Sequence, residues 1–234
     1  MSSSLPTYSK SSRQLAEIER IELHGVLPEV FRGEENSAAV RASQVWLSDL
    51  TLRRGTFYRI DAASGMGKSS LCAFIYGLRH DYVGTITFDG ADIARFDIAR
   101  VCEIRRRHLA YLPQALELFA ELTALDNVLL KNRLTDFRTE ADIRAMFSRL
   151  EIDNRMDSPA GRLSVGQQQR VALIRALCQP FDFLLLDEPV SHLDERNNRT
   201  CAEMVAEAAR AQGAGVIITS VGNPLMLEAQ QITL

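Results

Sequence analysis

The chain has 234 residues, of which 46% are hydrophobic and 24% are charged. These ordinary values indicate one large globular domain or two small ones and exclude collagen-like, low-complexity and coiled-coil proteins. The 27 Lys and Arg residues against 30 Asp and Glu residues give a formal net charge of -3, so binding of nucleic acid through overall charge is not expected. The apolar runs are far shorter than the roughly 18 to 20 residues that cross a bilayer.

The start of the chain predicts a flexible lead followed by short strands. Residues 1–20 are expected to be flexible, and their Ser-rich beginning lacks the apolar centre of a secretory signal, which favours a cytosolic protein. Ile21–Leu23 alternates like a strand, and so does Val45–Leu52, which ends at a turn before the extended Thr56–Asp61. We therefore expect the folded part, residues 21–234, to begin with a short β layer.

Strands and helices are then predicted to alternate. Ser69–Leu78 has apolar residues at helical spacing, and Gly84–Gly90 is typical of a strand bounded by glycines. From about residue 115 to 162, apolar residues alternate with charges at helical period, which indicates a helical insertion. Three brief apolar runs are typical of strands in a parallel sheet covered on both faces, namely 109–112, 183–186 and 216–219.

A glycine-rich segment lies between a predicted strand and a predicted helix, at Ala62–Ser69. Its glycines allow a tight turn in which backbone N–H groups converge on phosphate, and the following helix adds its positive end. Lys68 would reach the β and γ phosphates, and the Ser69 hydroxyl would coordinate Mg²⁺. The alternative is a glycine-rich turn with an incidental lysine. The expected binding residues are Ser64, Gly65, Met66, Gly67, Lys68, Ser69 and Ser70.

The segment departs from the phosphate-loop pattern at its first position, where Ala62 stands in place of Gly. A positive φ there would cost Ala on the order of 1 kcal/mol. A weaker affinity for nucleotide is the expected consequence.

A second acidic motif ends the apolar run at Phe183–Pro189. Asp187 is expected to hold Mg²⁺, directly or through water, and Glu188 to polarise a water for attack on the γ phosphate. A buried strand followed by a solvated acidic turn is the alternative. The phosphate loop in the same chain favours the nucleotide site.

The passage from Leu163 to Pro189 closely resembles the signature and Walker B region of ATP-binding-cassette (ABC) ATPases. Ser164 and Gln167 also fit a capping box, so starting a helix is an alternative role for this Ser. Val165 replaces the first glycine of the family signature. The resemblance covers roughly residues 21–234 and implies an α/β P-loop NTPase fold with a mainly parallel sheet, an antiparallel β subdomain and an inserted helical subdomain.

Other family landmarks fall in the same order. Tyr111–Gln114 resembles the Q-loop, whose Gln114 would touch Mg²⁺ or the attacking water, and Ser191–Asp194 resembles the D-loop. The family's switch histidine is replaced by Ser220, which predicts slower hydrolysis because a serine hydroxyl is shorter and carries no charge. Phe31 is the candidate for stacking on adenine, with a core or surface role as the alternative.

Three further features receive structural interpretations. His192 is expected at a dimer interface or on the plain surface rather than as a substitute for the switch histidine. Trp46 is expected to be a packing residue. The basic run Arg105–Arg107 is expected to form a solvated helix face, since acidic residues dilute it and no aromatic residues interleave.

The resemblance implies a head-to-tail dimer, or paired cassettes, with ATP and Mg²⁺ at the interface. Closure would occur through Ser164, Gly166 and Gln167 of the partner, and hydrolysis assisted by Glu188 would reopen the dimer. The motion would pass to separate integral membrane subunits, which places the chain in the cytoplasm, peripheral at the inner face of the membrane. No nucleic-acid partner is expected.

The docking surface for those subunits is expected just after Gln114. It would use Leu116, Leu118 and Phe119, exposed at the start of the helical insertion, with core packing as the alternative for all three. The stretch at 122–128 resembles ATPases of the lipoprotein-releasing and macrolide-export type. A regulatory or assembly subunit that binds ATP but scarcely hydrolyses it is the alternative function, suggested by Ala62, Val165 and Ser220.

Overall fold

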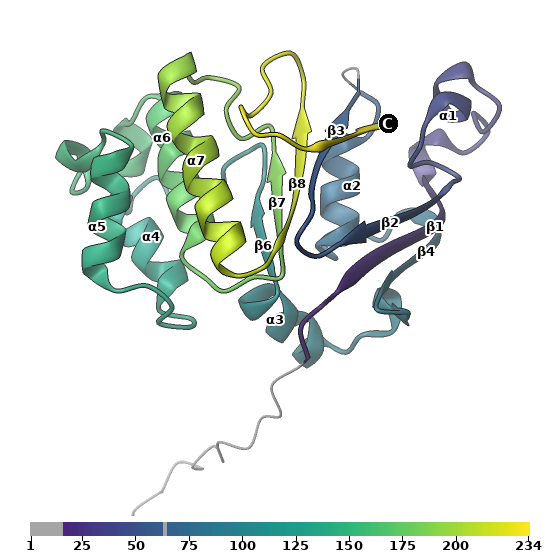
Figure 1. Ribbon diagram of the computed structural model, residues 1–234, viewed down its shortest axis with the longest axis horizontal. Helices are drawn as coiled ribbons and strands as arrows, with labels where there is room; N and C mark the ends of the chain where they lie inside the picture. Colours follow the sequence, from purple (N-terminus) through teal and green to yellow (C-terminus); the bar gives the residue numbers. More distant parts are fainter. Residues whose placement is uncertain (1–15, 63–64) are drawn as a thin grey trace, which may run out of the picture.

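The computed structural model describes residues 16–62 and 65–234, which form two sheets flanked by helices (Figure 1). The antiparallel sheet has the order β2-β1-β4-β5 and consists of β1 (Arg20–Pro28), β2 (Asp49–Arg53), β4 (Tyr82–Phe88) and β5 (Ala91–Asp92). The parallel sheet has the order β6-β7-β8-β3-β9 and consists of β3 (Phe57–Asp61), β6 (Leu109–Leu112), β7 (Phe183–Asp187), β8 (Gly215–Ser220) and β9 (Gln230–Thr233).

Helices cover both faces of the parallel sheet. The helices of the described residues are α1 (Ala38–Ala42), which lies beside the antiparallel sheet, and α2 (Lys68–Ile75), α3 (Ile98–Arg107), α4 (Ala124–Asn132), α5 (Glu140–Arg149), α6 (Val165–Leu177) and α7 (Glu195–Ala211). Because successive strand residues point to opposite faces, Leu184 and Leu186 pack with α4 to α7, whereas Phe183 and Leu185 pack with α2 and the antiparallel sheet. The predicted fold class, with its parallel sheet, antiparallel sheet and helical insertion, is confirmed.

The boundaries differ from the expected ones in several places. The helical insertion, expected from about residue 115, has its first helix only from Ala124. Residues 45–48 form a turn rather than strand, and β2 begins at Asp49. Helix α2 ends at Ile75, short of Leu78, because Gly77 adopts a left-handed φ of 70° and the Leu78 N–H turns back to the Ala73 carbonyl. The packed chain includes Ile18, which is 6% exposed; most of the expected flexible lead lies outside the described residues.

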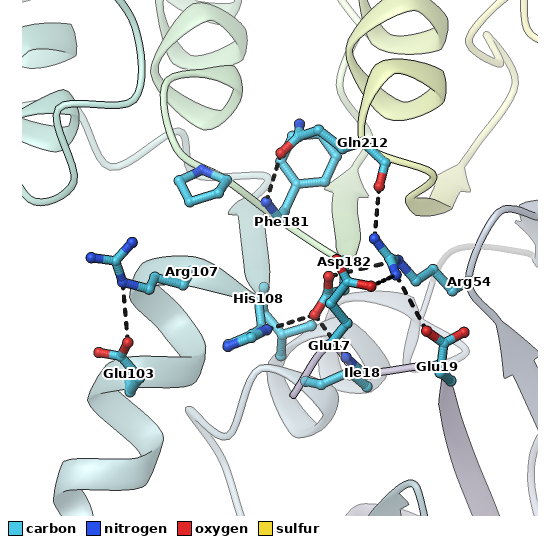
Figure 2. A network of polar contacts seen from close by, with 12 residues as sticks. Glu17, Ile18, Glu19, Arg54, Glu103, Arg107, His108, Phe181, Asp182 and Gln212 are labelled. Atoms are coloured by element: carbon cyan, nitrogen blue, oxygen red, sulfur yellow. Dashed lines mark hydrogen bonds and ion pairs between the residues drawn. The ribbon is translucent and has the colours of Figure 1, made fainter. Parts of the chain in front are cut away.

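An ion-pair network with a buried centre at Asp182 joins the start of the described chain to the base of the parallel sheet (Figure 2). Asp182 Oδ2 accepts from the Ile18 N–H over 2.8 Å and contacts His108 Nδ1 at 2.6 Å. Arg54 lies 3.6 Å from the other oxygen of Asp182 and also pairs with Glu17 and Glu19. This end of the sheet, where β6 and β7 begin, is therefore a structural junction.

No helix within residues 16–62 and 65–234 combines the length and the apolar character needed to cross a bilayer. The opposite end of the sheet, where the parallel strands finish, carries the candidate site.

Candidate functional site

Four parallel strands end at the same edge of the sheet. β3 ends at Asp61, β6 at Leu112, β7 at Asp187 and β8 at Ser220. The loops that follow carry the polar residues that the sequence predicted for nucleotide binding. Ligands of open α/β sheets bind at this edge.

The described residues directly before α2, 65–67, have backbone angles typical of a phosphate loop. Gly65 and Gly67 have φ values of 83° and 91°, a region that favours glycine, and Gly67 is the N-cap of α2. The N-terminal N–H groups of α2 have no helical acceptor, which suits an anion. Lys68 is 5% exposed, and its Nζ donates to the Ala62 carbonyl over 2.8 Å. Met66 is half-buried here; Ser64 lies outside the described residues.

Two aromatic side chains support this loop from outside. The Trp46 indole Nε1 donates to the Met66 carbonyl over 3.1 Å, and Trp46 is 1% exposed. A Cβ added at Gly67 would lie 3.0 Å from the Trp46 ring and 3.4 Å from the Phe31 ring, so the glycine also provides room. Trp46 is a packing residue, as predicted. The role of Phe31 in stacking on adenine stays a prediction, but its half-buried ring lies beside the loop.

A hydrogen-bond chain joins three of the predicted site residues. Ser69 Oγ donates to Gln114 Oε1 over 3.3 Å, and Gln114 Nε2 donates to Glu188 Oε2 over 3.2 Å. These residues follow β3, β6 and β7 respectively, so the chain spans the edge of the sheet. Glu188 has a φ of 51°, uncommon for a residue with a side chain, and its N–H is held by the Thr219 carbonyl at 3.2 Å. Ser70 lies beside Ser69 in α2 but is not part of these hydrogen bonds between Ser69, Gln114 and Glu188. Its Oγ accepts a hydrogen bond from Arg79 instead.

Asp187 has one oxygen engaged and one open. Thr219 Oγ1 donates to Oδ1 over 2.5 Å, whereas Oδ2 is buried without a hydrogen-bond partner among the described residues. A buried carboxylate oxygen without a partner is costly unless a cation or an ordered water satisfies it. Together with the oxygens of Ser69 and Gln114, this oxygen provides a donor set that fits Mg²⁺, which prefers oxygen ligands.

Ser220 is turned to a neighbouring strand. Its Oγ donates to Asp61 Oδ1 over 3.1 Å, and the residue is 6% exposed. Asp61 also accepts from Arg59 and from Gln231. The hydroxyl at the position of the family's switch histidine therefore contributes to a side-chain cluster at the ends of β3 and β8.

The signature residues lie at the start of another helix. Ser164 and Gln167 form the predicted capping box at the N-terminus of α6. A Cβ added at Gly166 would lie 3.0 Å from the His192 carbonyl oxygen, so the residue must be small for 190–194 to pack over the helix. No hydrogen bond in the described part of the chain joins Ser164 or Gln167 to the phosphate loop. His192 is exposed in the chain, as both a dimer interface and a plain surface position require, so the choice between them stays a prediction.

An apolar hollow of about 370 Å³ lies beside the segment that follows Gln114. Its rim includes Phe119, Leu130 and Leu134, which are 54%, 44% and 52% exposed. Lys131 and Arg175 also line it, and burial, with the nearby Arg175 and Arg105 cations, lowers the pKa of Lys131 to about 8.

Only one of the three residues predicted for a docking surface is exposed. Leu116 is 7% exposed and belongs to the core, and its backbone has a φ of 59°. Leu118 is partly buried against the same core, so the alternative of core packing is right for Leu116 and largely for Leu118. Phe119 is the exposed member.

The sequence analysis missed the role of three residues that act through a predicted one. Thr219 orients Asp187, Trp46 holds the Met66 carbonyl in addition to packing, and Gln169 bonds to Glu188 and to the two residues Ser191 and His192 after it. Only the contact of Thr219 with Asp187 could have been found from the sequence. If the two apolar strands are paired as neighbours in the sheet, Thr219 lies opposite Asp187.

Known proteins of one family are similar to this chain. A family model described as ABC transporter matches residues 47–191. The lipoprotein-releasing system ATP-binding protein LolD 1 of Caulobacter vibrioides is 30% identical over 204 residues, which are 85% of this chain and 84% of that protein. A macrolide export ATP-binding/permease protein MacB of a Shewanella species is 33% identical over 177 residues, which are 73% of this chain but 26% of that protein.

Solved structures show the same fold. The dimeric structure of MJ0796, a bacterial ABC transporter cassette, has a TM-score of 0.71 at 24% identity, covering 86% of this chain and 87% of that one. A post-hydrolysis dimer of the same cassette bound to ADP and Pi has a TM-score of 0.70 at 23% identity, covering 86% of this chain and 87% of that one.

Proposed function

The chain belongs to the ABC transporter family, and we propose that it is the ATP-binding and ATP-hydrolysing subunit of a transporter whose membrane-spanning part is another chain. The observation that carries this proposal is the convergence of Ser69, Gln114 and Glu188 through two hydrogen bonds at the ends of three parallel strands. Residues with the chemistry for metal, water and phosphate are brought together from distant parts of the sequence.

The site residues have distinct roles in this proposal. Backbone N–H groups from Gly65 to Ser70 hold the triphosphate. The Lys68 ammonium group, which donates to the Ala62 carbonyl in this structure, turns from that carbonyl to the β and γ phosphates and adds a positive charge there. Ser69, Gln114 and Asp187 hold Mg²⁺, which neutralises phosphate charge when bound. The Glu188 carboxylate accepts a proton from the attacking water, and its bond to Gln114 keeps it beside the metal ligands.

The proposal includes a dimer with nucleotide at the interface. Ser164, Gly166 and Gln167 of one chain would contact the nucleotide held by the other. Two observations support this: the exposed N-terminus of α6 provides anion-binding N–H groups, and dimers are described for the MJ0796 cassette. Val165 is 50% exposed at this helix tip, so its side chain would lie in that interface.

We further propose that the hollow beside Phe119 receives a short helical segment of the membrane subunit, which would hold this chain at the cytoplasmic face of the membrane. Exposed Leu130 and Leu134 extend the apolar rim, as expected of a protein interface. Lys131 at the same hollow favours a segment that also carries a carboxylate. Substituting Phe119→Glu should abolish copurification of the membrane subunit and leave ATP binding intact; unchanged copurification would count against this surface.

The ATPase proposal is tested by steady-state phosphate release from the purified chain, alone and with its membrane subunit. The Glu188→Gln variant should lose at least about a hundredfold in rate, because an amide cannot accept the proton. The same variant should still bind ATP and should accumulate as an ATP-bound dimer. Equal rates for the variant and the native chain would rule the proposal out.

A second candidate is a regulatory or assembly subunit that binds ATP and scarcely hydrolyses it. The engagement of Ser220 by Asp61, in place of a histidine free to contact the γ phosphate, is the observation in its favour. ATP-dependent dimerisation of the native chain with no phosphate release above that of Glu188→Gln would select this candidate.

A further inference from the structure

One buried amide side chain joins the start of α6 to the chain that carries Glu188. Gln169 is 3% exposed. Its Nε2 donates to Ser191 Oγ over 2.9 Å and, at a longer 3.5 Å, to the Glu188 carbonyl oxygen. Its Oε1 accepts from the His192 N–H over 3.1 Å. Both the NH₂ group and the oxygen of the Gln169 amide therefore form hydrogen bonds with the segment from Glu188 to the start of α7.

The same turn of α6 packs directly on that loop. Gly166 lies three residues before Gln169, on the same face of the helix. A Cβ added at Gly166 would lie 3.0 Å from the His192 carbonyl oxygen and 3.3 Å from the Leu193 side chain. This close approach fixes the distance between α6 and the loop, and the Gln169 amide bridges that distance. A shift of the helix tip must move the loop or break these hydrogen bonds.

A second amide holds the loop from the side of β8. Asn223 Nδ2 donates to the Val190 carbonyl over 3.1 Å and to the Leu193 carbonyl over 3.4 Å. Asn198 Nδ2 donates in turn to Asn223 Oδ1 over 3.3 Å, and Asn198 is 2% exposed. Residues 190–193 are thus fixed between α6 and the segment that follows Ser220.

The residue that most needs such support is Glu188. Its left-handed φ of 51° costs free energy that the surroundings must supply. The Thr219 carbonyl holds its N–H, the Gln114 amide holds its carboxylate, and Gln169 is the donor to its carbonyl. Because the carboxylate direction follows from the backbone, movement of Gln169 changes the position of Oε2 relative to Gln114 and Ser69.

We propose that Gln169 is a positioning residue for Glu188, through which the placement of the α6 tip determines whether the base is aligned. The inference rests on the proposed function, in which that tip contacts the nucleotide of the partner chain. Among the residues that the structure describes, the Gln169 side chain hydrogen-bonds to Glu188, Ser191 and His192 and makes no hydrogen bond to the phosphate loop or to the proposed metal ligands. Its loss should therefore lower kcat and leave the affinity for ATP largely unchanged.

The test is the substitution Gln169→Glu, assayed as phosphate release between pH 6 and pH 8.5. Ionised Glu keeps the shape and the acceptor but lacks the Nε2 donor, so kcat should fall roughly tenfold at pH 8.5. Burial raises the pKa of a carboxyl group at this position, so the acid is protonated near pH 6 and donates again. The rate relative to the native chain should then recover at least severalfold, while ATP binding stays within about twofold.

The matched control is Gln168→Glu, the same change one residue earlier. Gln168 Nε2 donates to the carbonyls of Ala160 and Leu163, and this side chain makes no hydrogen bond to residues 188–193. This variant should show no recovery of relative rate at low pH. Ser191→Ala removes the acceptor of Gln169 on an exposed residue, and it should lower kcat severalfold even if Gln169→Glu fails to fold.

Native kcat in both Gln169→Glu and Ser191→Ala, or a loss of ATP affinity as large as the loss of kcat, would overturn the role of Gln169. An absence of hydrolysis by the native chain with its membrane subunit would instead overturn the proposed function. The two failures are therefore distinguishable.

Discussion

Thr219 Oγ1 donates a 2.5 Å hydrogen bond to Asp187 Oδ1 across the adjacent strands β7 and β8, where the two residues are direct cross-strand partners. Asp187 is 1% exposed, so the hydroxyl is one of few groups that can fix the rotation of its carboxylate. The bond engages Oδ1 and leaves Oδ2 as the buried oxygen without a partner within the described residues. Thr219 thus determines which oxygen of Asp187 is available to a cation.

Replacing Thr219 by Val should weaken the binding of Mg²⁺. Val has nearly the shape of Thr but no hydroxyl, so Oδ1 loses its donor and the carboxylate is free to rotate. The Mg²⁺ concentration for half-maximal phosphate release should rise about tenfold. Thr219→Ser keeps a hydroxyl and should stay close to the native value. Equal Mg²⁺ requirements for the Val and Ser variants would show that the bond does not orient the metal ligand.

Replacing Trp46 by Phe should reduce ATP affinity. The indole N–H is the group that holds the Met66 carbonyl, and Phe keeps most of the packing but not that donor. A more mobile phosphate loop must be ordered when it binds, so we expect the Kd for ATP to rise about three- to tenfold. Isothermal titration calorimetry measures this directly. A change in thermal stability with an unaltered Kd would assign Trp46 to the core alone.

The parts of the site that the sequence predicted are those encoded by neighbouring residues. Gly65, Gly67, Lys68 and Ser69 follow one another between a strand and a helix, so local spacing is enough to place them. Gln169 could not be predicted in this way, because a single amide side chain on a helix has no local pattern. It reaches Glu188 only because α6 packs closely on the following loop at Gly166. Such contacts depend on tertiary packing, which no local pattern contains.

The surface was predicted less well than the core for a related reason. The sequence pattern predicted a helical insertion from about residue 115, but α4 begins only at Ala124, and Leu116 and Phe119 lie in the irregular segment before it. Leu116, with its positive φ, is buried there and Phe119 is exposed, which a helical period does not predict. The start of the folded part was likewise placed after Ile18. That residue is fixed by Asp182, 164 residues away in the sequence.

Replacing Ser220 by His should speed hydrolysis. The native hydroxyl bonds to Asp61, whereas a longer imidazole can extend into the shallow hollow that Ser220, Val221 and Gly222 line. A cationic or donor group near the γ phosphate stabilises charge in the transition state, so kcat should rise severalfold. Single-turnover phosphate release measures the effect. An unchanged rate would mean that this position does not limit hydrolysis in this chain.

Lys131 should make stability depend on pH in the alkaline range. Burial lowers its pKa from 10.5 to about 8, so between these values the unfolded chain binds more protons than the folded one. Folding stability contributed by this group therefore rises as the pH increases from about 8 to 10.5. Lys131→Met should be more stable than the native chain at pH 7, and this advantage should shrink by pH 10 in urea unfolding. A constant difference would contradict the lowered pKa.

Asp182 should contribute far more to stability than an exposed ion pair of the same kind. Its side chain is 7% exposed, contacts His108 and Arg54, and holds the Ile18 N–H (Figure 2). Asp182→Asn removes the charge and leaves these groups incompletely paired, so urea unfolding should show a loss of about 2 to 3 kcal/mol.

The comparison for Asp182 is Glu207→Gln, which removes the partner of Arg149 on the surface. Those side chains are 60% and 43% exposed, so water and salt screen the pair, and its loss should cost less than about 1 kcal/mol. ATP binding should change in neither variant, because Asp182 lies where β7 begins and the phosphate loop follows the far end of β3. Similar losses of stability in the two variants would show that the buried junction does not hold the start of the folded chain to the sheet.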